Sequence, residues 1–125
     1  SVYLRSQVST DATPLSFVIE PEVMRLYPGE QASVKMKIHN NSDIAQTYRL
    51  VAKTAPDTAK QYLHFDYIDN AKEVVIKPKQ SLVITPSLTV HKSIPKVLGD
   101  MSITMFLFSD KIDNAWKKMQ NNWNY

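Results

Sequence analysis

Three histidines and one short acidic segment are the residues of this 125-residue chain whose types could bind a metal ion. His39, His64 and His91 stand far apart and show neither His-x-His nor His-x-x-x-His, the close spacings that place two imidazoles on one ion. Asp66 and Asp69 belong to a segment that lacks the regularly spaced oxygen ligands of a calcium-binding loop. We therefore expect polar strand residues and a plain turn, and no metal site.

Groups for covalent or cofactor chemistry are also missing from the sequence. The chain has no cysteine, which excludes disulfides, zinc–thiolate centres and cysteine nucleophiles. Its two glycines, Gly29 and Gly99, are far apart, whereas dinucleotide- and phosphate-binding loops need several within a few residues. No serine or threonine stands in a recognisable hydrolase pattern. We expect no catalytic residue, no cofactor and no small-molecule substrate, so the protein is predicted not to be an enzyme.

Length and charge indicate one domain without a nucleic-acid partner. A chain of 125 residues suffices for one hydrophobic core. The net charge is +3, but the lysines are scattered and form no basic cluster with interleaved aromatics. No apolar run approaches the roughly 18 residues of a transmembrane helix. Because the chain starts at Ser1 rather than at methionine, we expect a mature or trimmed form, with any membrane anchor outside this chain.

Residues 27–43 contain the clearest structural pattern, a turn followed by a strand and a second turn. Pro28-Gly29 is a strong turn dipeptide, because proline fixes φ and glycine accepts a positive φ. Apolar and polar residues then alternate, which predicts a strand over residues 32–39 with one buried face. A second alternating segment, residues 46–53, follows a short turn, so we expect the two strands to be antiparallel neighbours.

The same alternation recurs along the chain and predicts the fold class. We predict strands over residues 15–20, 23–27, 32–39, 46–53, 62–68, 73–76, 81–90 and 101–108. No helical pattern separates them, which argues against parallel strand–helix–strand units. The prediction is an all-β fold, an Ig-like antiparallel β-sandwich of about seven to eight strands with a short C-terminal amphipathic helix.

The chain divides into three predicted parts. Residues 1–14 are polar and predict a flexible lead-in or a first edge strand. Residues 15–109 form the sandwich. Residues 110–125 have apolar side chains at helical spacing and predict the C-terminal helix followed by an aromatic tail.

The longest alternating run, residues 81–90, is the first candidate for partner binding. Pro86 interrupts it, so the strand is expected to lie at a sheet edge, to carry a bulge or to switch sheets there. An unpaired edge is a template for strand addition, although Pro86 could equally protect it. The tail is the second candidate, because tryptophan and tyrosine are enriched at interfaces. The predicted contact residues are Leu82, Ile84, Pro86, Leu88, Trp123 and Tyr125.

Asn40 is a candidate glycosylation site. Asn40-Asn41-Ser42 matches the acceptor sequence for an N-linked glycan and is expected to lie in an exposed turn. The turn itself favours asparagine, so a plain turn residue is the alternative.

The order of these elements resembles a known group of proteins. The first half of the layout consists of three motifs in order, with an alternating strand before the last: Glu20-Pro21-Glu22, Leu26-Tyr27-Pro28-Gly29-Glu30 and Asn40-Asn41-Ser42. A second half begins near Val74. This layout is similar to the Ig-like modules of the PapD-like and major-sperm-protein-like group, and to Ig-like domains of bacterial and archaeal cell envelopes. The resemblance covers residues 15–108 and implies a binding module.

Three functions remain open at this stage. The first is a non-enzymatic structural or interaction module of a cell-surface or envelope-associated assembly. It would dock a protein partner or another copy of itself through a sheet edge and the aromatic tail, in an extracytoplasmic location. The second is a carbohydrate- or cell-wall-binding module that uses Tyr62, Tyr67 or Trp123 as stacking platforms. The third is a cytoplasmic major-sperm-protein-like adaptor that binds short acidic peptides near Lys53.

Overall fold

The computed structural model of the chain describes residues 2–10 and 15–109, and within these ranges the fold is all-β and sandwich-like. The strands are β1 (Val2–Thr10), β2 (Leu15–Glu20), β3 (Val23–Leu26), β4 (Gln31–Ser33), β5 (Lys35–Asn40), β6 (Gln46–Ala55), β7 (Leu63–His64), β8 (Lys72–Ile76), β9 (Ser81–Ile84), β10 (Ser87–Val90) and β11 (Asp100–Ser109). Two short 3-10 helices, η1 (Asp57–Tyr62) and η2 (Lys96–Leu98), complete the described elements.

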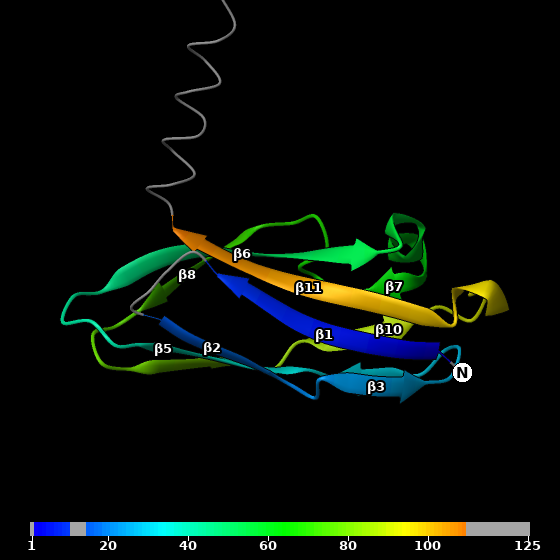
Figure 1. The fold of residues 1–125 in the computed structure, drawn as a ribbon, viewed down its shortest axis with the longest axis horizontal. Coiled ribbons are helices and arrows are strands. Elements are labelled where there is room, and N and C mark those ends of the chain that lie inside the picture. Colours follow the sequence, from blue (N-terminus) through cyan, green and yellow to red (C-terminus); the bar gives the residue numbers. More distant parts are fainter. Residues whose placement is uncertain (1, 11–14, 110–125) are drawn as a thin grey trace, which may run out of the picture.

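The strands form two layers around one core (Figure 1). One layer is a five-stranded sheet with the order β3-β1-β11-β6-β8. The other consists of two three-stranded sheets, β2-β5-β9 and β4-β10-β7. They join end to end, since the N–H of Val34, between β4 and β5, donates to the C=O of Pro86, between β9 and β10, at 3.0 Å. This interruption divides the predicted strands 32–39 and 81–90 into two shorter strands each.

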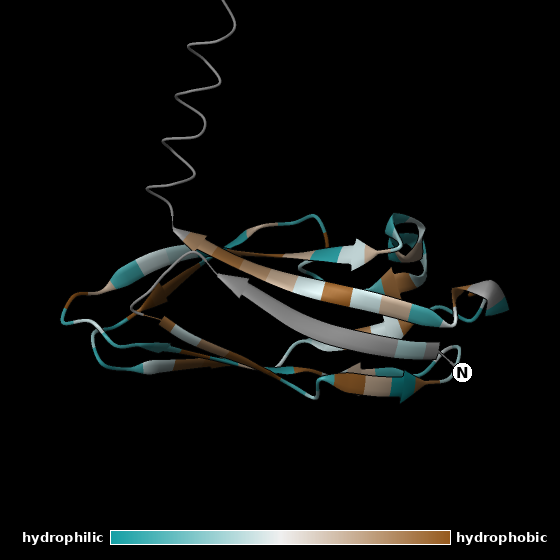
Figure 2. Ribbon diagram, viewed as in Figure 1, coloured by the Kyte–Doolittle hydropathy of each residue, from teal (hydrophilic) through white to brown (hydrophobic). Residues whose placement is uncertain are grey.

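The alternation of side chains that predicted the strands is present in the structure. Met36 and Ile38 on β5 are fully buried, while Lys35 and Lys37, which alternate with them, are exposed. Along β11 buried and less buried residues alternate in the same way, and Figure 2 shows the corresponding bands of hydropathy. Phe106 on the outer face of β11 is 37% exposed, so the described residues cover this strand fully on its inner face only.

The first strand is placed differently from the expectation for residues 1–14. Residues 2–10 form β1, which lies inside the five-stranded sheet, between β3 and β11, rather than at an edge. β1 is parallel to β11 and antiparallel to β3, so the sandwich is not purely antiparallel. The predicted C-terminal helix and tail, with Trp123 and Tyr125, lie outside the described residues.

Two predicted strands also differ in the structure. Residues 81–90 form two strands that belong to different three-stranded sheets, so of the three alternatives expected at Pro86 the structure shows the switch of sheets, with β9 also at a sheet edge. Most of the predicted strand 62–68 is instead a turn that follows the two-residue strand β7. Phe65 and Tyr67 are nevertheless buried and pack against each other with ring centroids 5.5 Å apart.

Asn40 ties the two layers together at the end of β5. Its side chain is fully buried, and its Nδ2 donates to the carbonyl oxygens of Ile44 at 2.8 Å, Ile76 at 3.0 Å and Lys77 at 3.3 Å. Its Oδ1 accepts the backbone N–H of Ser42 at 2.9 Å and contacts the Ser42 hydroxyl at 2.7 Å. The expectation that Asn40 lies in an exposed turn is therefore wrong, and the folded chain leaves no room for a glycan on this nitrogen.

Replacing Asn40 by alanine should destabilise the fold strongly. The variant would remove the hydrogen bond to the buried carbonyl of Ile76 and those to the partly buried groups of Ser42 and Lys77, and a buried group left without a partner costs about 1–3 kcal/mol. We expect Asn40→Ala to lower the free energy of unfolding by about 2–4 kcal/mol in urea denaturation. Asn41→Ala is the matched control, because Asn41 is exposed and, in the part of the chain that the structure describes, its side chain hydrogen-bonds the exposed Ser16 hydroxyl at 3.2 Å. Equal losses in the two variants would contradict the assignment.

Candidate functional site

The outer face of the β2–β5–β9 sheet gathers polar and basic residues from three strands. The strand register aligns Ser16, His39 and Ser81 in one row across the sheet. The next row contains Val18, Lys37 and Val83, and the third aligns Glu20 with Lys35. Val18 and Val83 are about equally exposed, at 51% and 50%, which is high for valine in a strand. This outer face is the most distinctive surface of the described residues.

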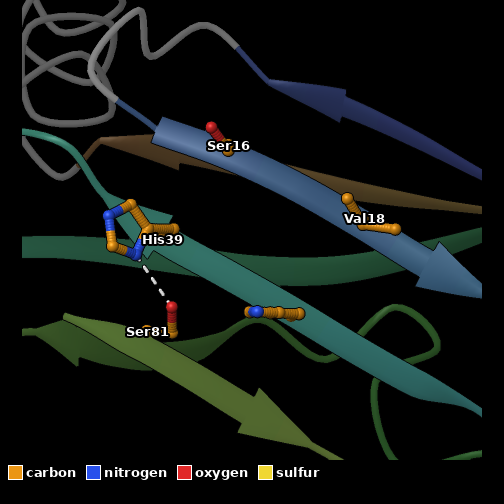
Figure 3. A pocket seen from close by; sticks show the side chains of 5 residues that line it. Ser16, Val18, His39 and Ser81 are labelled. Carbon is orange, nitrogen blue, oxygen red and sulfur yellow. Dashed lines mark hydrogen bonds between the residues drawn. The ribbon is translucent and has the colours of Figure 1, made fainter.

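Two adjoining shallow hollows lie on the outer face. They have volumes of about 270 and 240 Å³, and both are lined by Val18 and Lys37. Figure 3 shows the second hollow, in which His39 lies between β2 and β9 and its Nδ1 is 2.8 Å from the Ser81 hydroxyl. The His39 register partners are both serines, and within the described residues the contact shown for its ring is the one to the Ser81 hydroxyl.

The other two histidines share a hollow at the opposite end of the layer. His64 and His91 both line a depression of about 200 Å³ beside β7 and β10. His91 is held by Ser93, whose backbone N–H donates to Nδ1 at 3.1 Å and whose hydroxyl lies 2.7 Å from it. The part of the chain that the structure describes contains no cluster of three or more metal-ligating side chains. Sequence spacing did not predict that these two histidines would line the same hollow.

The acidic turn is occupied by lysines rather than left open for a cation. The Lys53 Nζ lies 2.6 Å from the Asp69 Oδ1, and the Lys60 Nζ lies 3.5 Å from the Asp69 Oδ2. The hydrogen bond from Lys53 lowers the pKa of the Asp69 carboxyl below its ordinary value. Lys53, the residue proposed for acidic-peptide binding, thus already has an anionic partner within the chain.

Hydrogen bonds around β9 show which way its peptide groups point. The N–H of Asn40 donates to the C=O of Gln80 at 2.9 Å, and Val34 makes the equivalent bond to Pro86. Hydrogen-bonded pairs alternate with non-hydrogen-bonded pairs along an antiparallel ladder. The even-numbered residues from 80 to 86 therefore direct their peptide groups toward the β5 side. The odd-numbered residues direct theirs to the opposite side.

That opposite side of β9 is a free edge. Among the described strands β9 pairs with β5 alone, so Ser81, Val83 and Thr85 present unpaired N–H and C=O groups. All three residues are exposed. The segment 80–85 contains no charged residue and no proline, two of the means by which edge strands are protected, although β9 itself is short at four residues. We call these three residues the β9 edge.

Pro86 does not protect the β9 edge. The nitrogen that lacks a hydrogen faces Val34 inside the layer, where it interrupts the ladder between the two three-stranded sheets. Its effect is to separate β9 from β10, and the outward side of the strand is unaffected.

The predicted contact residues of segment 81–90 all lie on the inward side of this layer, where Pro86 is partly buried. Leu82 and Ile84 point inward and pack partly buried against the core. Leu88 is fully buried on β10, which lies between β4 and β7 and is not an edge strand, so Leu88 is not available to a partner. Ser81 and Val83, the outward residues of the same alternation, were missed, although the period-two pattern of 81–84 could have identified them.

The aromatic platforms expected for sugar binding are also placed differently. Tyr67 is 8% exposed and Tyr62 is half-buried against the core, so neither offers an open ring face. Among the described tyrosines, the exposed ones are Tyr3, at 43%, and Tyr27, at 57%. The guanidinium of Arg25 lies 5.9 Å from the Tyr3 ring centroid and 5.7 Å from that of Tyr27. The pairing of β1 with β3 brings this group together, which the sequence alone does not reveal.

No protein-family model and no curated protein matches the chain. In the described ranges, no helix has the length and apolar character needed to cross a membrane.

Amide hydrogen exchange should distinguish the two sides of β9. Leu82 and Ile84 donate into the ladder with β5, whereas the amides of Ser81 and Val83 face solvent. We expect the Leu82 and Ile84 amides to exchange more slowly by a factor on the order of a hundred, measured by NMR at low protein concentration. Equal protection along 81–84 would show that another segment covers this edge.

The Asp69 carboxyl should titrate below its ordinary pKa of 3.8 because Lys53 stabilises the carboxylate. Since the pKa is lowered on folding, the pair stabilises the fold at neutral pH, and this contribution is lost as the pH falls through the folded-state pKa. Lys53→Gln should raise the pKa toward 3.8, as read from the carboxyl carbon shift by NMR. Lys77→Gln, far from this contact, should leave it unchanged. A pKa of Asp69 at or above 3.8 would refute the pairing.

Proposed function

We propose that the protein is a non-enzymatic, Ig-like interaction module that docks an extended protein strand on the β9 edge. The observation that carries this proposal is the β9 edge itself, an uncharged strand side with unpaired peptide groups at Ser81, Val83 and Thr85. Natural proteins normally protect such edges, so an unprotected one supports a role in strand addition. The turn pattern that resembles envelope Ig-like domains supports a place in a cell-surface or extracytoplasmic assembly.

Strand addition at this edge combines two sources of affinity. Each backbone hydrogen bond contributes about 0.5–1.5 kcal/mol net, and every second residue of the edge offers both a donor and an acceptor. Val83, half exposed in the free chain, would be covered by the side chain opposite it. Lys37 and His39 on β5 would be two strand spacings from the added strand, on the other side of β9.

A carbohydrate-binding role is the second candidate. The observation that favours it is the exposed pair Tyr3 and Tyr27 with Arg25 between them, rather than the rings predicted from sequence. Aromatic faces stack on the apolar faces of sugars, and a guanidinium suits their hydroxyl or carboxylate groups. A cytoplasmic adaptor for acidic peptides has less support, since Lys53 is paired with Asp69.

Binding of a strand-forming peptide tests the proposed function. The peptide alternates valine and threonine and has charged residues only at its ends. Its twin carries N-methyl groups on all of its central amides, which removes the donors of both edges. We expect the unmodified peptide to protect the Ser81 and Val83 amides from exchange, and the twin to bind at least tenfold more weakly, equivalent to about 1.4 kcal/mol.

Variants at Val83 locate the binding to the β9 edge. Val83→Pro removes an outward N–H and leaves the bonds to β5 intact, so it should weaken peptide binding about tenfold. Val83→Lys keeps the N–H and adds an edge charge, and should weaken binding similarly without risk to the ladder. Val83→Thr is the matched control and should bind normally. Peptide binding that is absent, or unchanged in the proline and lysine variants, would overturn the proposed function.

A further inference from the structure

We infer that the strand docked on β9 is β9 of a second copy of this chain, with Val83 of one copy opposite Val83 of the other. This inference rests on the proposed function and specifies its partner. The two strands would run antiparallel about a twofold axis and join the two β2–β5–β9 sheets into one continuous sheet.

The register follows from the orientation of the peptide groups. The β9 edge consists of Ser81, Val83 and Thr85, so a symmetric antiparallel pair must be centred on its middle residue. Val83 then forms a hydrogen-bonded pair with its own copy, and Ser81 of each copy faces Thr85 of the other. Both pairs are of favourable type, since β-branched residues and hydroxyl residues pair well across strands.

The charge pattern is the reason to choose a second copy over a foreign strand. Symmetric pairing brings every residue of 80–85 close to the same segment of its copy, so a single charged residue there would create like-charge contacts. This segment has none. The nearest cations on the outer face, Lys35 and Lys37, lie on β5. The two β5 strands would be three strand spacings apart, roughly 14 Å, which exceeds the Debye length of about 8 Å at physiological salt.

The size of the contact sets its expected strength. One strand-to-strand contact over 80–85 is small compared with the about 1,000 Å² of a stable interface. We therefore expect a weak, reversible dimer that forms at high protein concentration. The twofold arrangement also closes on itself, whereas pairing of β9 with the β2 edge of another copy would leave open ends and produce chains of copies.

Single-cysteine variants test the register sharply, because the chain has no cysteine of its own. In a hydrogen-bonded antiparallel pair the two Cα atoms are about 5.5 Å apart, within the range of a disulfide. We expect Val83→Cys to form a disulfide-linked dimer under mild oxidation. Ser81→Cys alone should not, because the two copies of residue 81 would be on the order of 14 Å apart along the strands. A mixture of Ser81→Cys and Thr85→Cys should form the mixed dimer.

Val18→Cys is the matched control for random collision, since Val18 lies on the same outer face and has nearly the same exposure as Val83. It should cross-link at least tenfold more slowly. Cross-linking of Val83→Cys no faster than this control would overturn the inference. If the strand peptide still protects the β9 amides in that case, the proposed function stands and only its partner is wrong. If the peptide also fails to bind, both fail.

Discussion

The register of β5 is the constraint on which the rest of this structure depends. Along β5 every second side chain enters the core and every second peptide group bonds to β9. Because both alternations have a period of two, burying Met36 and Ile38 also decides which groups β9 uses to pair with β5. A slip by one residue would bring Lys37 into the core, which is strongly unfavourable. The hydrophobic pattern of β5 thus determines which peptide groups of β9 remain unpaired on its outward side.

On β9, the residues whose side chains point outward are also the residues whose peptide groups point away from β5. Leu82 and Ile84 are the opposite case, because their side chains pack against the core and their peptide groups face β5. Within the described residues, Val83 uses neither its side chain nor its peptide group for such contacts, and Ser81 uses only its hydroxyl, which contacts His39. The peptide groups of both residues therefore remain for an incoming strand. The end of β5 is fixed independently by Asn40, whose buried amide holds the turn after β5 and the end of β8. The edge is therefore part of a well-defined layer.

Local patterns predicted much of this fold, and long-range contacts explain what they missed. The alternation over 32–39 predicted β5 because one face of the strand is buried and the other exposed. The strand predicted over 62–68 was mostly wrong, because Phe65 and Tyr67 are buried although they lie in a turn. Alternating burial therefore did not require a strand there. β1 was missed as an interior strand because its place depends on pairing with β11, at the other end of the described chain.

At the candidate site, too, local sequence patterns predicted one part and long-range contacts determined the rest. The segment around β9 could be identified as unusual from its length and Pro86, but its useful face could not be assigned without the partners of Pro86 and Gln80. The burial of Asn40 depends on carbonyl groups from β8, which no local pattern indicates.

The outward peptide groups of β9 should be free in the single chain and become paired when two copies associate. The decisive measurement is exchange of the Val83 amide over a wide range of protein concentration. Protection of Val83 should rise with concentration, while that of Leu82 stays constant. Complete protection of Val83 at the lowest concentration would show that the edge is covered in the single chain, and protection that never rises would show that the copies do not pair there.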